Sequence, residues 1–251
     1  MYDNFLNKLK YFKVEKIYNN KILVVTMNRA PVNAFIKESY LELSAIMNYI
    51  NQDMELCSMI FNSSQKIFSA GADVKQLAKD SVEEAALRRP ILRKSGADFY
   101  SCAIPMVVAV NGAAVGAGAV FAACGDIIVA AENAFFSIPE INVGVVGGAK
   151  GLSRLLPPQK VRSLALTGGR ITAQEVQQYG GVEAVVPENE LFETALEYAK
   201  TIADKGSLAV RKWKESLLLI ESVGPREGLL IEQCLGQELS LLSPAPSIIR
   251  N

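Results

Sequence analysis

The 251-residue chain contains no histidine at all. This absence excludes Ser-His-Asp and Cys-His catalysis, zinc sites built on imidazole, and the usual proton shuttle near neutral pH. Acid–base chemistry in this protein must therefore come from a carboxylate, lysine, tyrosine, cysteine or water.

Long apolar runs and an excess of one charge are missing as well. No uninterrupted apolar run reaches the roughly 20 residues of a membrane-spanning helix, and the first residues lack the features of a secretion signal. The 26 basic and 26 acidic residues balance, so no global field attracts nucleic acid or an anionic membrane. The four cysteines lie far apart, which favours free thiols over disulfides or a metal site and indicates a reducing, cytoplasmic compartment.

The most informative stretch covers residues 105–126. Met106–Val110 is an apolar, β-branched run typical of a buried strand, and Asn111-Gly112 predicts a turn. A run rich in glycine and alanine follows, and it predicts a buried helix over Val115–Ala123. Small residues let a ligand approach the main chain, and the first turn of a helix has unpaired N–H groups. The stretch is suited to holding a developing negative charge; tight helix packing is the alternative.

A second small-residue motif, Ser69–Asp73, lies upstream of this stretch. Asp73 is placed to cap a helix that begins at Val74. The following segment, Ser81–Tyr100, is more charged and is predicted to be helical. Its basic cluster forms either a solvated face or a phosphate-binding rim. The cluster consists of Arg88, Arg89, Arg93 and Lys94.

Strand and helix patterns alternate as far as Pro187, which predicts an α/β fold. Val14–Tyr18 and Ile22–Met27 are expected to form a hairpin. After Glu188 only helical patterns follow, over residues 191–205, 208–220 and 227–242. The glycine-rich segment 144–151 matches neither a nucleotide P-loop nor a dinucleotide fingerprint.

Six collinear segments together resemble the crotonase, or enoyl-CoA hydratase/isomerase, superfamily. They are residues 28–34, 68–73, 111–118, 126–130, 136–141 and 166–175. The resemblance implies a crotonase-like spiral of ββα repeats over residues 1–187 and a C-terminal helical segment over 188–251 that serves oligomerisation. It also implies a homotrimer or a dimer of trimers. An acyl-CoA thioester is the implied substrate, with coenzyme A as part of the substrate, no permanently bound cofactor and no metal.

The resemblance also assigns catalytic roles. In the family two backbone N–H groups receive the thioester oxygen as it becomes an enolate, and those positions match Ala70 and Ala117. A catalytic glutamate matches Glu140, but the second glutamate of family hydratases is replaced by Val120. The implied activity is the shift of an enoyl-CoA double bond with Glu140 as the single acid/base. Alternatives are a hydratase, a decarboxylase, a non-catalytic acyl-CoA binder and an RNA-binding relative, and Glu140 itself has the alternative of being an ordinary surface residue.

Substrate contacts follow from the same resemblance. Arg29 and Lys75 are either ordinary exposed charges or contacts to the phosphates of coenzyme A. The chain ends soon after Leu239, so nucleotide contacts fall to these two residues, to a neighbouring subunit, or to none. The complete implied set is Arg29, Ala30, Val32, Ser69, Gly71, Ala72, Asp73, Val74, Lys75, Gly116, Val120, Pro139 and Gly148.

Overall fold

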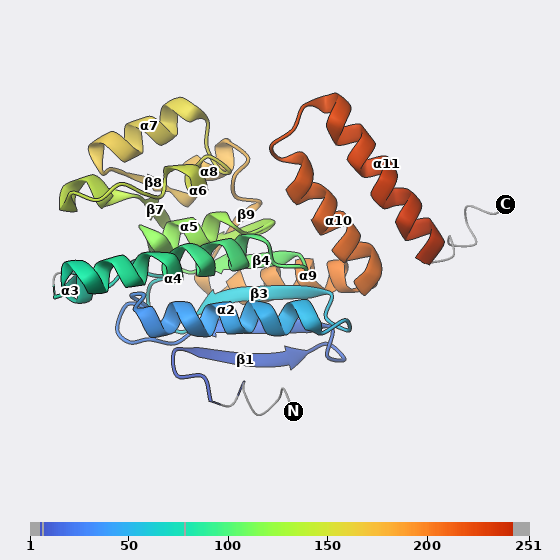
Figure 1. The fold of residues 1–251 in the computed structure, drawn as a ribbon, viewed down its shortest axis with the longest axis horizontal. Helices are drawn as coiled ribbons and strands as arrows, with labels where there is room; N and C mark the ends of the chain where they lie inside the picture. Colours follow the sequence, from blue (N-terminus) through green and yellow to red (C-terminus); the bar gives the residue numbers. More distant parts are fainter. Residues whose placement is uncertain (1–5, 7, 78, 243–251) are drawn as a thin grey trace.

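The computed structural model describes residues 6, 8–77 and 79–242, and Figure 1 shows how its elements are arranged. A six-stranded sheet has the strand order β1-β2-β3-β4-β6-β9, and a three-stranded sheet has the order β5-β7-β8. The strands are β1 Phe12–Ile17, β2 Ile22–Met27, β3 Ser58–Ser63, β4 Met106–Val110, β5 Ala113–Val115, β6 Ile127–Ala131, β7 Phe135–Ser137, β8 Arg170–Thr172 and β9 Ala184–Val186. The helices are α2 Lys37–Gln52, α3 Val74–Leu77, α4 Val82–Tyr100, α5 Ala117–Ala123, η1 Pro139–Val143, α6 Ala149–Leu152, α7 Pro158–Thr167, α8 Ala173–Gln178, η2 Glu188–Glu190, α9 Leu191–Ala203, α10 Ser207–Ile220 and α11 Pro225–Leu242.

The predicted N-terminal hairpin is confirmed. β1 pairs antiparallel with β2, with Ile17 opposite Ile22, and the turn residues Tyr18, Asn19 and Asn20 all have positive φ. All other pairs of the large sheet are parallel. Parallel strands need a crossover between them, which is why helices alternate with strands along the chain.

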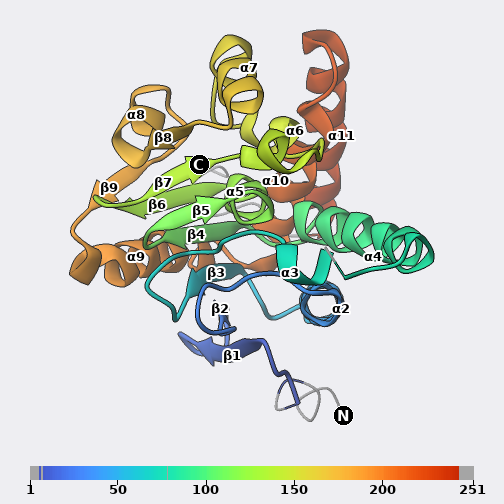
Figure 2. The same cartoon turned by 90° about the vertical axis from the view of Figure 1, so that its left-hand side faces the viewer.

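Successive strand pairs contribute to both sheets, which gives the predicted spiral of ββα units. β4 joins the large sheet, and β5, which follows directly, joins the small one; β6 and β7 repeat this arrangement. Helix α5 then continues from β5, as Figure 2 shows near the centre of the molecule. Helix α5 therefore begins directly after a strand of the small sheet.

An apolar core lies on each face of the large sheet. Successive side chains of a strand point to opposite faces, so they enter the two cores in turn. On β2, Leu23 and Val25 belong to the core shared with α2, α4 and α5, whereas Ile22 and Val24 face α9. Figure 2 shows the sheet between α9 on one side and α2 with α4 on the other. Helix α9 thus packs on the sheet; the predicted division of the chain at residue 187 stays a prediction.

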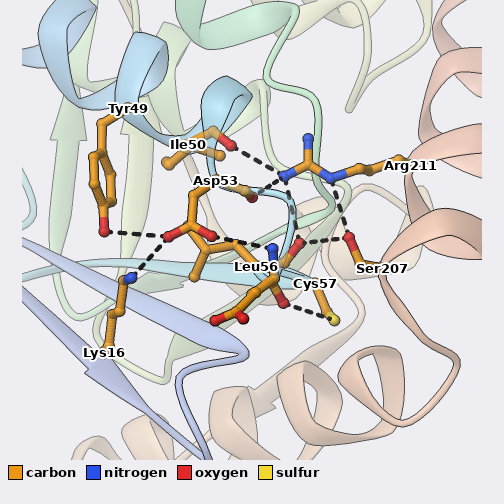
Figure 3. A network of polar contacts seen from close by, with 9 residues as sticks. Lys16, Tyr49, Ile50, Asp53, Leu56, Cys57, Ser207 and Arg211 are labelled. Atoms are coloured by element: carbon orange, nitrogen blue, oxygen red, sulfur yellow. Dashed lines mark hydrogen bonds and ion pairs between the residues drawn. The ribbon is translucent and has the colours of Figure 1, made fainter. Parts of the chain in front are cut away.

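Helices α10 and α11 form an antiparallel pair at one end of the molecule (Figure 1). Figure 3 shows how α10 is joined to the end of α2: Arg211 donates to the carbonyls of Ile50 and Asp53 at 3.0 and 2.6 Å. Its Nε also donates to Ser207 at 3.2 Å. The guanidinium satisfies the carbonyls that the end of a helix leaves without partners. The Asp53 carboxylate is in turn paired with Lys16 at 2.7 Å.

Two local predictions are wrong. Helix α5 begins at Ala117 rather than Val115, because residues 113–115 pair with β7 as strand β5 and Gly116 turns the chain with φ +53°. The sequence also predicts a helix over Ser153–Leu156, but those residues form a turn and a bend, and helix α6 covers Ala149–Leu152. The residues from Pro244 on, where Pro244-Ala245-Pro246 predicts a loose tail, lie outside the described residues. Within the described ranges, no helix combines the length and apolarity needed to cross a bilayer.

Candidate active site

The two small-residue motifs predicted from the sequence meet in the structure. Ser69 forms a parallel bridge with β5: its N–H donates to Ala113 at 3.0 Å, and its carbonyl accepts from Val115 at 2.9 Å. Gly71 then passes so close to the start of α5 that a Cβ on it would come within 2.6 Å of the Val115 carbonyl oxygen and 3.2 Å of the Ala117 nitrogen. Only glycine allows this approach, and its φ of +83° requires glycine as well.

The Ala70 N–H donates to the Val32 carbonyl at 2.9 Å. This bond contradicts the prediction that the Ala70 N–H receives a thioester oxygen, because the donor is already used. The Ala72 N–H is placed differently. The Gly71 carbonyl accepts from Phe35 at 2.7 Å, and the C=O and N–H of a trans peptide point in opposite directions. The Ala72 N–H therefore faces away from residues 32–35, on the α5 side, and no hydrogen-bond partner for it exists among the described residues.

The Ala117 N–H is the second donor at this place. Ala117 is the first residue of α5, and the first N–H groups of a helix have no partner within it. The Gly116 carbonyl accepts from Val120 at 3.1 Å, along the helix. The Ala117 N–H consequently points backward out of the helix, beside Gly71. Two backbone donors at one point can stabilise an oxygen that gains negative charge.

Glu140 lies in the first turn of η1 and reaches the same place. A Cβ on Gly116 would come within 2.9 Å of its Oε1, and its Oε2 is buried with no hydrogen-bond partner among the described residues. Burial raises the pKa of this carboxyl, an effect that a hydrogen bond from its own backbone partly opposes. A half-buried carboxyl with one unpaired oxygen and a raised pKa is suited to accepting and returning a proton.

Val120 is partly buried at the position of the missing second glutamate. The Val120 side chain packs against α6, where a Cβ on Gly151 would be 3.1 Å from Val120 Cγ1. Gly148, with φ +84°, lies against both Ile138 and Val120. The isopropyl group of Val120 neither transfers a proton nor orients water, whereas the carboxyl of Glu140 lies at this point.

Arg29 and Asp73 form an ion pair at 2.8 Å, and Asp73 directly follows Ala72. Arg29 also donates to the Ala34 carbonyl at 2.9 Å, and Asp73 caps α3 by accepting from Lys75 and Gln76. Burial acts to raise the pKa of Asp73, but the hydrogen bond from Arg29 and the two backbone N–H groups lower it below its usual value. The predicted capping role of Asp73 is confirmed.

The remaining predicted contacts have clear locations. Val74 and Lys75 are exposed on the first turn of α3, and Ala30 is exposed before the cis peptide to Pro31. Pro139 begins η1 directly before Glu140. Among the described residues no group of three cysteine, aspartate or glutamate side chains is arranged to hold a metal ion.

The comparisons with known proteins agree with this geometry. The family model described as enoyl-CoA hydratase/isomerase matches residues 17–223. The chain is 34% identical over 221 residues to the (7aS)-7a-methyl-1,5-dioxo-2,3,5,6,7,7a-hexahydro-1H-indene-carboxyl-CoA hydrolase of Rhodococcus jostii, covering 88% of this chain and 86% of that one. It is 34% identical over 214 residues to the carnitinyl-CoA dehydratase of Salmonella typhimurium, covering 84% and 82%. The crystal structure of an enoyl-CoA hydratase from Bacillus anthracis superposes with a TM-score of 0.87 at 29% identity, covering 94% and 92% of the two chains. The chain belongs to the enoyl-CoA hydratase/isomerase family and has the crotonase fold.

Proposed function

We propose that this acyl-CoA enzyme shifts a double bond, converting a 3-enoyl-CoA into a 2-enoyl-CoA with Glu140 as its single acid/base. One observation carries the proposal. The half-buried carboxyl of Glu140 lies at the start of α5, beside the Ala72 and Ala117 N–H groups, with its Oε2 buried and without a partner among the described residues, while position 120 offers only an isopropyl side chain. Isomerisation needs one base next to an enolate-stabilising pair of donors, whereas hydration needs a second group to hold water.

The reaction follows from these three groups. Glu140 removes a proton from C2 of the substrate, the C–H electron pair moves into the C1–C2 bond, and the thioester oxygen becomes negative. The N–H groups of Ala72 and Ala117 donate to that oxygen. The protonated Glu140 then returns the proton to C4: the C3–C4 π pair forms the new C4–H bond, the C1–C2 π pair becomes the C2–C3 double bond, and the thioester carbonyl re-forms. The atoms of the substrate are conserved, as isomerisation requires.

The environment of Glu140 supports both halves of this cycle. A carboxylate of ordinary acidity would be a weak base near neutral pH. Burial raises the pKa of Glu140, which strengthens it as a base and lets its acid form persist long enough to return the proton.

Hydrolysis is the second candidate. It is favoured by two relatives, 34% and 33% identical, whose names describe hydrolases of a dioxo-indene-carboxyl-CoA. In that reaction Glu140 would activate a water molecule that adds to the ring ketone of a 3-oxoacyl-CoA. The C2–C3 bond then breaks, the same two N–H groups stabilise the thioester enolate that forms, and protonation at C2 completes the ring opening.

Further properties are proposed with the activity. The coenzyme A part arrives with the substrate, and the exposed Lys75 on α3 meets its phosphates. A homotrimer or dimer of trimers is supported by α11, whose apolar residues Leu229, Leu230, Leu241 and Leu242 are exposed. A monomer in light scattering at micromolar concentration would overturn the assembly. Free thiols at all four cysteines support a reducing compartment such as the cytoplasm.

A panel of CoA thioesters tests the function. The protein is incubated with 2-enoyl-, 3-enoyl-, malonyl- and cyclic 3-oxoacyl-CoA, and products are identified by mass and chromatography. We expect a product of unchanged mass from 3-enoyl-CoA. A product of cyclic 3-oxoacyl-CoA that has gained one water favours the hydrolase. Loss of carbon dioxide from malonyl-CoA favours a decarboxylase, and binding without turnover favours a non-catalytic binder.

A further inference from the structure

Ser69 is completely buried, and its hydroxyl both donates and accepts a hydrogen bond. The Oγ donates to the Asn33 carbonyl at 2.8 Å and accepts from the Gly71 N–H at 3.1 Å. A serine hydroxyl has one hydrogen to donate, and here it is used to tie residues 69–71 to the neighbouring segment. The bond from the Gly71 N–H holds the peptide between Ala70 and Gly71, which directly precedes the peptide that carries the Ala72 N–H.

The same residue is in contact with the second donor's helix. The Ser69 main chain exchanges two hydrogen bonds with β5, the strand that leads into α5. A Cβ on Gly118, in the first turn of α5, would come within 2.7 Å of Ser69 Cβ and 2.9 Å of its Oγ. The first turn of α5 therefore rests directly on Ser69, and Ala117 is held within that turn.

Asn33, the partner of the hydroxyl, is itself fixed from several sides. It is buried with φ +48°. Its Nδ2 donates to Ser63 Oγ at 2.7 Å and to the Phe68 carbonyl at 3.1 Å, and its Oδ1 accepts from the Arg29 N–H at 2.8 Å. The bond from Ser69 thus ends on a residue that cannot easily move.

We propose that Ser69 is a positioning residue that sets the distance and direction between the Ala72 and Ala117 N–H donors. The inference rests on the proposed function, because it assigns Ser69 a role in presenting those donors to the thioester oxygen. Gly71 has no side chain to restrict its rotation. Without the Ser69 hydroxyl the Gly71 N–H loses a buried partner. The peptide that carries the Ala72 N–H is then held only from the other side, by the bond from the Phe35 N–H to the Gly71 carbonyl, and its alignment with the Ala117 N–H is less tightly fixed.

The test compares Ser69→Ala with a matched control, Ser58→Ala. Ser58 is also completely buried, and its hydroxyl donates one hydrogen bond, to the Ala199 carbonyl at 3.0 Å, on the α9 side of the large sheet. Both variants lose a buried hydroxyl and its hydrogen bonding, but only Ser69 contacts the residues next to the Ala72 and Ala117 N–H groups. Readouts are kcat and KM for 3-enoyl-CoA and the absorption of bound dimethylaminocinnamoyl-CoA, a chromophore whose band shifts to the red when its thioester carbonyl is polarised.

We expect Ser69→Ala to lower kcat about 10- to 100-fold, with KM changed by no more than about threefold, because a misaligned donor is lost mainly from the transition state. The red shift of the bound chromophore should decrease. Ser58→Ala should keep both kcat and the red shift. Ser69→Cys, which keeps the volume and a weak S–H donor, should lie between wild type and Ser69→Ala, and it serves as the test should the alanine variant not fold.

Two outcomes would overturn the inference in different ways. A full red shift and a wild-type kcat in Ser69→Ala, or in Ser69→Cys alone if only that variant folds, would remove the positioning role and leave the proposed function intact. A wild-type protein that turns over no 3-enoyl-CoA and gives no red shift would overturn both.

Discussion

The carboxylate of Glu140 lies against the Cα of Gly116, so closely that a Cβ there would come within 2.9 Å of Oε1. Gly116 is also the residue directly before Ala117, whose N–H is one of the two donors. The proposed acid/base group and one of the two proposed donors therefore both lie next to the same glycine.

Gly116→Ala should lower kcat/KM at least about 100-fold, because the new methyl group displaces the carboxylate and the φ of +53° strains any residue with a Cβ. Gly206→Ala is the matched control. Gly206 also has positive φ, +86°, but a Cβ on it meets no atom within 4 Å. Similar losses of activity in both variants would show that backbone strain, and not displacement of Glu140, is responsible.

Glu140→Gln should lower kcat about 10²- to 10⁴-fold, the range of general acid–base catalysis. The amide keeps the shape of the side chain but cannot accept a proton. In the wild type, kcat/KM should fall as the pH drops and Glu140 becomes protonated. Because burial raises the pKa of Glu140, the midpoint should lie above the ordinary value of 4.5. A midpoint at or below that value would contradict the assigned environment.

The same substitution should raise stability at neutral and alkaline pH. The pKa of Glu140 is higher in the folded state, so ionisation costs folding free energy. That cost is absent below the unfolded pKa, near 4.5, and it is complete above the folded pKa. The thermal unfolding temperature of Glu140→Gln should therefore exceed that of the wild type by more at pH 8 than at pH 4. A constant difference would mean that the carboxyl is not desolvated.

Lys214 is only 1% exposed and pairs with both oxygens of Asp126 at 2.6 and 2.8 Å, joining α10 to the start of β6. Lys214→Met should lower the free energy of unfolding by about 3 kcal/mol, because it leaves Asp126 partly buried without its counter-charge. Lys212→Met is the control from the same helix. Its partners Glu215 and Glu238 are half exposed, so a loss below about 1 kcal/mol is expected. Equal losses in urea titrations would argue against a special role for the buried pair.

The elements that build the frame of this site could be predicted from local sequence. The apolar run of Met106–Val110 predicts β4. Thr172 with Glu175 three residues later is the sequence pattern of a capping box, and the structure has that box at the start of α8. These signals depend on residues a few positions apart. Glu140 and Ala117 were predicted only through the resemblance to a family, since no local pattern distinguishes them from surface or packing residues.

The identity of the first donor could not be predicted correctly. Ala70 and Ala72 are chemically equal and flank the same glycine. Which N–H is used depends on the bonds from Ala70 to Val32 and from Phe35 to Gly71, and so on pairing with a segment more than thirty positions away. The prediction of a helix from Val115 had the same weakness, because long-range pairing with β7 makes residues 113–115 a strand. The Ser69 hydroxyl likewise gives no signal in the sequence alone.

The chemistry itself gives the sharpest prediction. The wild type should convert 3-enoyl-CoA to 2-enoyl-CoA faster than it hydrates 2-enoyl-CoA, because hydration needs water held between two acid–base groups and Val120 supplies none. Val120→Glu should raise the hydration rate specifically, since it places a second carboxylate one helical turn after Gly116, whose Cα Glu140 contacts.

Val120→Gln is the control for this gain. It has the same size and a hydrogen-bonding end but no base, so hydration should stay at the wild-type rate in it. Both variants crowd Gly148 and Gly151, which Val120 contacts, so circular dichroism must first show that both fold. Efficient hydration of crotonyl-CoA by the wild type, together with unchanged activity of Glu140→Gln, would rule out the isomerase mechanism and the role of Glu140, because water addition would then proceed without the proposed acid/base group.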